Sequence, residues 1–93
     1  MNILITGGTG SVGKILTNLL IRRPDVKKVM IYSRCEHKQE RMYRDFSYND
    51  NHAKLRFLIG DIRDKPRLKT AMKNVTHVIH TAALKIVPAM EFN

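Results

Sequence analysis

The 93-residue sequence contains one cysteine, no tryptophan and no apolar run long enough to span a membrane. The single cysteine, Cys35, cannot form an internal disulfide, and this usage is typical of proteins from reducing compartments. The apolar run at the N-terminus stops in glycines and lacks the cleavage site of a secretory leader, and a membrane span would need about 20 apolar residues. We therefore expect a cytoplasmic protein that makes no membrane contact.

Acidic residues are also scarce, with 8 Asp and Glu against 17 Lys and Arg, and the formal net charge is +9. Such a balance would suit a nucleic-acid-binding protein. The basic residues are dispersed, however, and aromatic residues do not alternate with them as a base-stacking surface would require. We interpret the charge as a solvated surface and keep nucleic-acid binding as the disfavoured alternative.

Short apolar runs alternate with amphipathic stretches along the sequence. They predict strands at 2–6, 27–33, 55–59 and 76–82, and helices from 11 to the turn before Pro24, over 36–46 and over 65–73. This order predicts an α/β fold, namely a Rossmann-type doubly wound parallel sheet. The sheet would be incomplete, with four strands in the order 3-2-1-4.

This topology carries expectations about packing. The first two helices should cover one face of the sheet and the third helix the other. The fourth strand should lie at an unpaired edge, where apolar side chains of the first and fourth strands would stay partly wet and promote self-association. The first helix should turn its apolar stripe toward the sheet, and that stripe consists of Val12, Ile15, Leu16, Leu19 and Leu20.

The stretch ITGGTGSVGKI, near the N-terminus, fits two phosphate-binding patterns. From Gly8 it nearly matches the P-loop, but Ile15 stands where a hydroxyl must hold Mg²⁺. From Gly7 it has the spacing G-x-x-G-x-x-G of a dinucleotide loop, and a predicted strand and helix flank it. Gly7 would then allow the tight turn, Gly10 the approach of a pyrophosphate and Gly13 the close packing of helix on strand. The sequence therefore favours a dinucleotide.

The end of the second predicted strand indicates which dinucleotide. An NAD site usually has an acidic residue there to bind the ribose 2′-hydroxyl, whereas an NADP site often has arginine. Here Ser33 and Arg34 occupy that place, and Lys38 lies one turn further on. A guanidinium and a hydroxyl can both bond a 2′-phosphate, which a carboxylate would repel. NADP is favoured, and the nearby Glu36 leaves NAD open.

The ends of the third and fourth predicted strands carry further candidates. Asp61 could accept from an adenine amino group while Ile62 meets the ring, although Asp61 would equally suit a turn or helix cap. After the fourth strand, the small Ala82 and Ala83 leave room for a cofactor, and Lys85 would point into the crevice. The two histidines of the fourth strand are interpreted as structural, and no cluster in the sequence has the spacing of a metal site.

Four motifs together resemble a family. They are T-G-G-T-G-S-x-G, Y-S-R-x-E-x-K-Q, G-D-I-R-D and A-A-L-K-x-V-P, in chain order. They resemble extended short-chain dehydrogenase/reductases, and more narrowly they are similar to the UDP-N-acetylglucosamine 4,6-dehydratases of the polysaccharide-biosynthesis group. The resemblance covers essentially the whole chain. It implies a tightly held NADP, oxidation of a UDP-sugar at C4, elimination of water across C5 and C6, and return of the hydride to C6. It also implies a homo-oligomer for the full-length enzymes.

The resemblance assigns roles residue by residue. Ser33, Arg34 and Lys38 would bind the 2′-phosphate, while Asp61 and Ile62 would hold the adenine. Lys85 would lie between the cofactor and the sugar nucleotide. The residues implied at the pyrophosphate and elsewhere along the cofactor are Gly7, Thr9, Gly10, Ser11, Val12, Gly13, Thr81 and Ala82.

The sequence departs from the family pattern in two ways. Cys35 stands where the family commonly has Asp, so the second helix should have a weaker cap. The catalytic Tyr-x-x-x-Lys pair of the family occurs nowhere in the 93 residues, and no catalytic residue is predicted. We therefore interpret residues 1–93 as the N-terminal NAD(P)-binding Rossmann portion of such an enzyme, without the remaining strands and the sugar-nucleotide domain. The alternative is a non-catalytic NADP-binding sensor or interaction module.

Overall fold

The structure, a computed structural model, describes residues 1–82 and 85–91. Every predicted strand and helix is present, with shorter ends than expected on β2, α3 and β4. One strand, β5, and two 3-10 turns were not predicted. The elements are β1 (Asn2–Thr6), α1 (Ser11–Ile21), β2 (Lys28–Ser33), α2 (Glu36–Phe46), η1 (His52–Lys54), β3 (Leu55–Ile59), α3 (Lys65–Ala71), β4 (His77–His80), β5 (Lys85–Pro88) and η2 (Ala89–Glu91).

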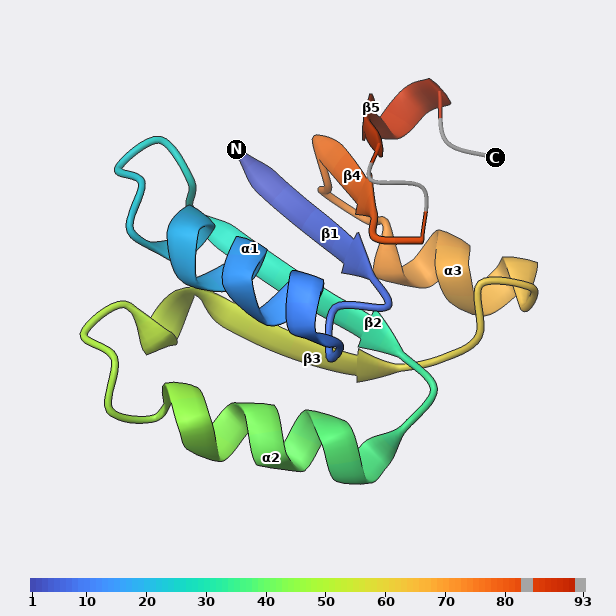
Figure 1. Cartoon of the computed structure of the whole chain (residues 1–93). Helices are drawn as coiled ribbons and strands as arrows, with labels where there is room; N and C mark the ends of the chain where they lie inside the picture. The colour runs from blue at the N-terminus through green and yellow to red at the C-terminus, as the bar shows by residue number, and fades with distance from the viewer. Residues whose placement is uncertain (83–84, 92–93) are drawn as a thin grey trace.

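The strands form one sheet in the order β3-β2-β1-β4-β5 (Figure 1). The first four strands in that order are parallel, so the predicted order 3-2-1-4 is confirmed. In the central strand, Ile3 pairs with Val29 of β2 on one side and with His77 of β4 on the other. The carboxyl ends of four parallel strands consequently meet at one edge of the sheet, which is where doubly wound folds bind ligands.

The fifth strand corrects two expectations. β5 runs antiparallel to β4 and pairs along its outer edge, with Val87 opposite Val78 and Lys85 opposite His80. The edge of β4 is therefore covered by residues of the same chain. The side chains of Leu4 and Val78 are completely buried rather than partly wet. The expectation of an open edge was wrong because the sequence pattern does not reveal that residues 85–88 fold back onto the preceding strand.

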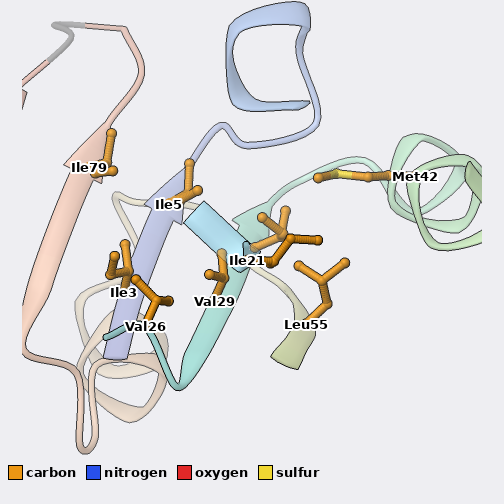
Figure 2. Packing of buried hydrophobic residues seen from close by; sticks show 9 residues of the cluster. Ile3, Ile5, Ile21, Val26, Val29, Met42, Leu55 and Ile79 are labelled. Atoms are coloured by element: carbon orange, nitrogen blue, oxygen red, sulfur yellow. The ribbon is translucent and has the colours of Figure 1, made fainter. Parts of the chain in front are cut away.

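Two apolar clusters lie on opposite faces of the sheet. Because side chains alternate along a strand, Ile3 and Ile5 point to one face and Leu4 to the other. The first cluster lies under α1 and α2 (Figure 2) and consists of Ile3, Ile5, Ile21, Val26, Val29, Ile31, Met42, Leu55 and Ile79. The second lies under α3 and consists of Leu4, Tyr32, Leu68, Ala71 and Val78. The predicted distribution of the three helices over the two faces is therefore confirmed.

The first helix is rotated relative to the prediction. Its buried row is Gly13, Thr17 and Ile21, at a spacing of four residues. Ile15 and Leu19 remain 62% and 56% exposed, so they do not face the sheet as expected. The glycine side of the helix is the one that packs closely: an added Cβ at Gly13 would lie 2.3 Å from the Gly8 carbonyl oxygen.

Candidate functional site

A cavity of about 600 Å³ opens where β1, β2, β3 and β4 end. It brings together ten of the predicted site residues from four separate segments of the chain. These ten are Gly7, Thr9, Gly10, Ser33, Arg34, Lys38, Asp61, Ile62, Thr81 and Ala82. The sequence analysis did not name the other lining residues, Thr6, Tyr32, Cys35, Gly60, Arg63 and His80, as site residues.

The turn after β1 requires a glycine at its first position. Gly7 has φ of +70°, a left-handed conformation that costs a residue with a Cβ. An added Cβ would also lie 2.6 Å from the Thr81 hydroxyl oxygen. The Gly7 N–H donates to the Tyr32 carbonyl at 2.9 Å, and the Thr81 hydroxyl donates to the Thr6 carbonyl at 2.8 Å. The turn at Gly7 and the Thr81 side chain therefore pack closely against each other at the base of the cavity.

Gly10 is different, because no contact among the described residues requires a glycine there. Its φ is −76°, and an added Cβ would meet only the Gly7 carbonyl oxygen at 3.8 Å. The space that a side chain would fill belongs to the cavity. Gly10 is also the N-cap of α1, which has no side-chain cap and no acidic residue in its first turn. The first N–H groups of α1 and the positive end of its dipole therefore lie next to this part of the cavity, an environment that suits an anionic group.

Another part of the cavity lining is cationic. Ser33, at the end of β2, is buried, whereas the Arg34 side chain is 72% exposed. Arg34, Lys38 and Arg63 line the cavity together with a single carboxylate, that of Asp61. This balance suits a ligand with a second anionic group at some distance from the first.

Asp61 is held by two arginines. The Arg63 guanidinium donates to both carboxylate oxygens, with Nη2 2.7 Å from Oδ2 and Nε 3.1 Å from Oδ1. The Arg63 backbone N–H donates to Oδ1 at 2.9 Å, and Arg34 Nη1 lies 3.7 Å from Oδ2. The side-chain hydrogen bond from Arg63, followed by its backbone N–H, lowers the pKa of Asp61 to about 2. The carboxylate is therefore ionised and fixed in direction at neutral pH.

The Tyr32 side chain packs against the turn at Asp61 and donates a hydrogen bond to it, a role that the sequence analysis missed. The side chain is completely buried, and its hydroxyl donates to the Asp61 carbonyl at 2.9 Å. Gly60 is needed beside it, since a Cβ at that position would lie 2.3 Å from the Tyr32 hydroxyl oxygen. The glycine directly after the third strand was the one available signal that a large side chain packs against this turn.

Four predicted site residues lie outside the lining. Ser11, Val12 and Gly13 belong to the first turn of α1, where Gly13 packs on the loop and Val12 is 45% exposed. Lys85 is exposed at the start of the antiparallel β5. Ala83, which was expected to leave room for a cofactor, falls outside the described residues.

Two other features bear on the chemistry of the site. Cys35 is the N-cap of α2 and its side chain makes no capping hydrogen bond, in line with the expected weak cap. Within residues 1–82 and 85–91, no three His, Cys, Asp or Glu side chains are grouped as a metal site would require.

Over the same residues, no helix combines the length and the apolar character needed to cross a bilayer.

Comparisons with known proteins give a consistent result. The family described as polysaccharide biosynthesis protein matches residues 3–93. The chain is 51% identical over 92 residues to a UDP-N-acetylglucosamine 4,6-dehydratase (inverting) from Campylobacter jejuni, covering 99% of this chain and 26% of the relative. It is 43% identical over 93 residues to a UDP-glucose 4-epimerase from Rickettsia typhi, covering 97% and 26%.

A similar solved structure is a dTDP-glucose 4,6-dehydratase from Bacillus anthracis, which was determined in complex with NAD. It matches 86% of this chain and 26% of its own length with a TM-score of 0.70 and 20% identity, which shows a shared fold. The chain thus spans about a quarter of the length of its curated relatives.

Proposed function

The chain belongs to the polysaccharide biosynthesis protein family, and we propose that it is the NADP-binding portion of a nucleotide-sugar enzyme similar to UDP-N-acetylglucosamine 4,6-dehydratase. One observation carries the proposal. The same cavity is lined by Gly10, the N-cap of a helix without a side-chain cap, and by a cationic rim that consists of Arg34 and Lys38. A pyrophosphate and a ribose 2′-phosphate are two anionic groups on one ligand, and they would match these two ends.

The residues present fit such a cofactor. The first N–H groups of α1 would bond the pyrophosphate, and the absence of a side chain at Gly10 would let it approach. Ser33, Arg34 and Lys38 would hold the 2′-phosphate. Asp61, with its carboxylate already fixed by Arg63, would accept from the adenine amino group, and the adjacent Ile62 would meet the ring. Thr81 and Ala82 would lie along the rest of the cofactor.

The sugar chemistry follows from the relatives. Both curated relatives are named for reactions of a UDP-hexose at position 4. When bound, the nicotinamide would supply a reversible hydride acceptor. It would take the hydride during oxidation of the sugar at C4, and the same hydride would return to C6 after water has been eliminated across C5 and C6. Lys85 would meet the sugar nucleotide. The remaining partners of this proposal are a UDP-sugar and, for the full-length enzyme only, further copies of that enzyme, in the cytoplasm.

A second candidate is a non-catalytic NADP-binding module. The observation in its favour is that no tyrosine in the 93 residues is followed four positions later by lysine, since Tyr32, Tyr43 and Tyr48 precede Glu36, Ser47 and His52. Without such a pair, the 93-residue chain has no proton-transfer group of the expected kind.

Titration of NADP and NAD against the chain tests the cofactor assignment. We expect tighter binding of NADP, and Arg34→Ala should weaken NADP by about ten- to a hundredfold while changing NAD little, because a charge-assisted contact to the phosphate is lost. Arg44→Ala is a matched control, since Arg44 lies on α2 in an exposed pair with Glu40. Equal affinities for both cofactors in the parent chain and in the Arg34 variant would overturn the assignment.

A further inference from the structure

Gln39 is a buried polar residue that the proposed cofactor roles do not use. It lies on α2 and is only 5% exposed. Its side-chain nitrogen Nε2 is 2.9 Å from the Ser33 hydroxyl oxygen and 2.9 Å from the Leu58 carbonyl oxygen. The Ser33 carbonyl oxygen is more distant, at 3.5 Å. Gln39 thus connects the second helix to the carboxyl ends of β2 and β3, directly behind the cationic rim.

The contacts determine the direction of the Gln39–Ser33 hydrogen bond. A backbone carbonyl can only accept, so the end of the Gln39 amide that meets the Leu58 oxygen must be the NH₂ group. That group has two hydrogens, and its two short contacts are with Leu58 and the Ser33 hydroxyl. The Ser33 hydroxyl oxygen therefore accepts from Gln39.

An accepting hydroxyl keeps its own proton for another partner, because a serine has one O–H donor and two lone pairs. Ser33 lines the cavity beside Arg34 and Lys38. We propose that Gln39 is a positioning residue that directs the Ser33 hydroxyl proton into the cavity, and so favours a ligand group that only accepts hydrogen bonds. This inference rests on the proposed NADP site.

A phosphate monoester has the matching chemistry. Its oxygens accept only, and a hydroxyl that donates to an ionised oxygen makes a bond about twice as strong as a neutral one. The 2′-hydroxyl of NAD can also accept from Ser33, but without charge. Gln39 would therefore contribute to the preference for a 2′-phosphate without contacting the ligand.

The measurement is the ratio of the NAD and NADP dissociation constants of the 93-residue chain, taken for a set of variants. Gln39→Met keeps the length of the side chain and removes the amide, and Ser33→Ala removes the hydroxyl while leaving the Gln39 contact with Leu58 in place. We expect each to lower the ratio by about tenfold or more. The double variant should lower it no further than Ser33→Ala, because Gln39 acts through that hydroxyl. Thermal unfolding without ligand verifies that each variant is folded.

Gln39→Glu adds a further test, because it replaces the group that donates to the Ser33 hydroxyl with a carboxylate that accepts. The carboxylate would draw the Ser33 proton away from the cavity. Gln39→Glu should lower the ratio at least as much as Gln39→Met. Glu40→Gln, an exposed change one position along the same helix, is the matched control and should leave the ratio unchanged.

Each result bears on the inference. A Gln39→Met or Gln39→Glu protein that keeps the parent ratio, while Arg34→Ala loses it, would overturn the role of Gln39 and leave the NADP site standing. An unchanged ratio in Ser33→Ala would overturn it as well, even if the Gln39 variants did not fold. A ratio of one between the NAD and NADP dissociation constants of the parent chain would overturn the NADP assignment itself, and with it the proposed role of Gln39.

Discussion

The hydroxyl oxygen of Tyr32 lies in the space that a side chain at position 60 would need, 2.3 Å from where a Cβ of residue 60 would be. The same hydroxyl donates to the carbonyl of the next residue, Asp61. Gly60, in turn, donates its N–H to the Ser33 carbonyl at 2.9 Å. The second and third strands are thus linked at their carboxyl ends, under the residues proposed to hold adenine and the 2′-phosphate.

Gly60→Ala should destabilise the fold by about 1–3 kcal/mol, because the buried Tyr32 ring must move to admit a methyl group. Urea unfolding measures the change. Gly10→Ala is the matched variant, since its Cβ would enter the open cavity. It should cost less than about 1 kcal/mol, as a poorer N-cap, but should abolish cofactor binding. If the two variants had the same effects on stability and binding, the distinction between a packing glycine and a ligand-approach glycine would be wrong.

The Asp61 carboxyl should make stability depend on pH in the acid range. Its pKa is lowered to about 2 by Arg63, whereas an unfolded Asp has a pKa near 3.9. The native state therefore binds this proton less readily, so the stabilisation is fully present above about pH 4 and is lost as the pH falls toward about 2.

Urea midpoints near pH 6 and near pH 2 test this for the parent and for Asp61→Asn. The parent should be the more stable at the higher pH, and most of this difference should be lost near pH 2, where the native Asp61 carboxyl is about half protonated. Asp45→Asn serves as a control, because Asp45 is exposed and has no ion pair among the residues that the structure describes. A difference between the parent and Asp61→Asn that was as large near pH 2 as near pH 6 would contradict the assignment of the shift to this carboxyl.

The pairing of β5 with β4 should keep the chain from associating. Val87 packs against the second apolar cluster, whereas its neighbour Ile86 is 66% exposed. Val87→Asp should release β5, uncover the edge of β4 and cause association at about 0.15 M salt, where charge repulsion is screened. Ile86→Asp should leave a monomer. Sedimentation of both variants decides the matter, and a monomeric Val87→Asp protein would show that β5 does not protect this edge.

The 93-residue chain should not turn over a sugar nucleotide. Because it contains no Tyr-x-x-x-Lys pair, it lacks the expected proton-transfer groups even with NADP bound. Incubation with UDP-N-acetylglucosamine and NADP, followed by mass spectrometry, should detect no 4-keto sugar. Product above a no-enzyme control would mean that other residues of the chain perform the proton transfers.

The sequence by itself determined the order of strands and helices and the position of the glycine loop. These features are local, since apolar periodicity and glycine placement act over a few neighbouring residues. The ends of parallel strands must meet at one edge of a doubly wound sheet, so Ser33, Arg34 and Asp61 could be predicted to lie near Gly10 before any coordinates were known.

Only the tertiary structure decided which partners these residues have. The hold of Arg63 on Asp61 depends on the conformation of the turn, and the bond from Gln39 to Leu58 joins residues 19 positions apart. The return of β5 onto β4 likewise had no signal in the local pattern, because an antiparallel edge strand of four residues is specified by the surface it covers. Periodicity shows that a segment is a helix or a strand, but the rotation of that segment and the contacts of its polar side chains follow from packing against distant parts of the chain.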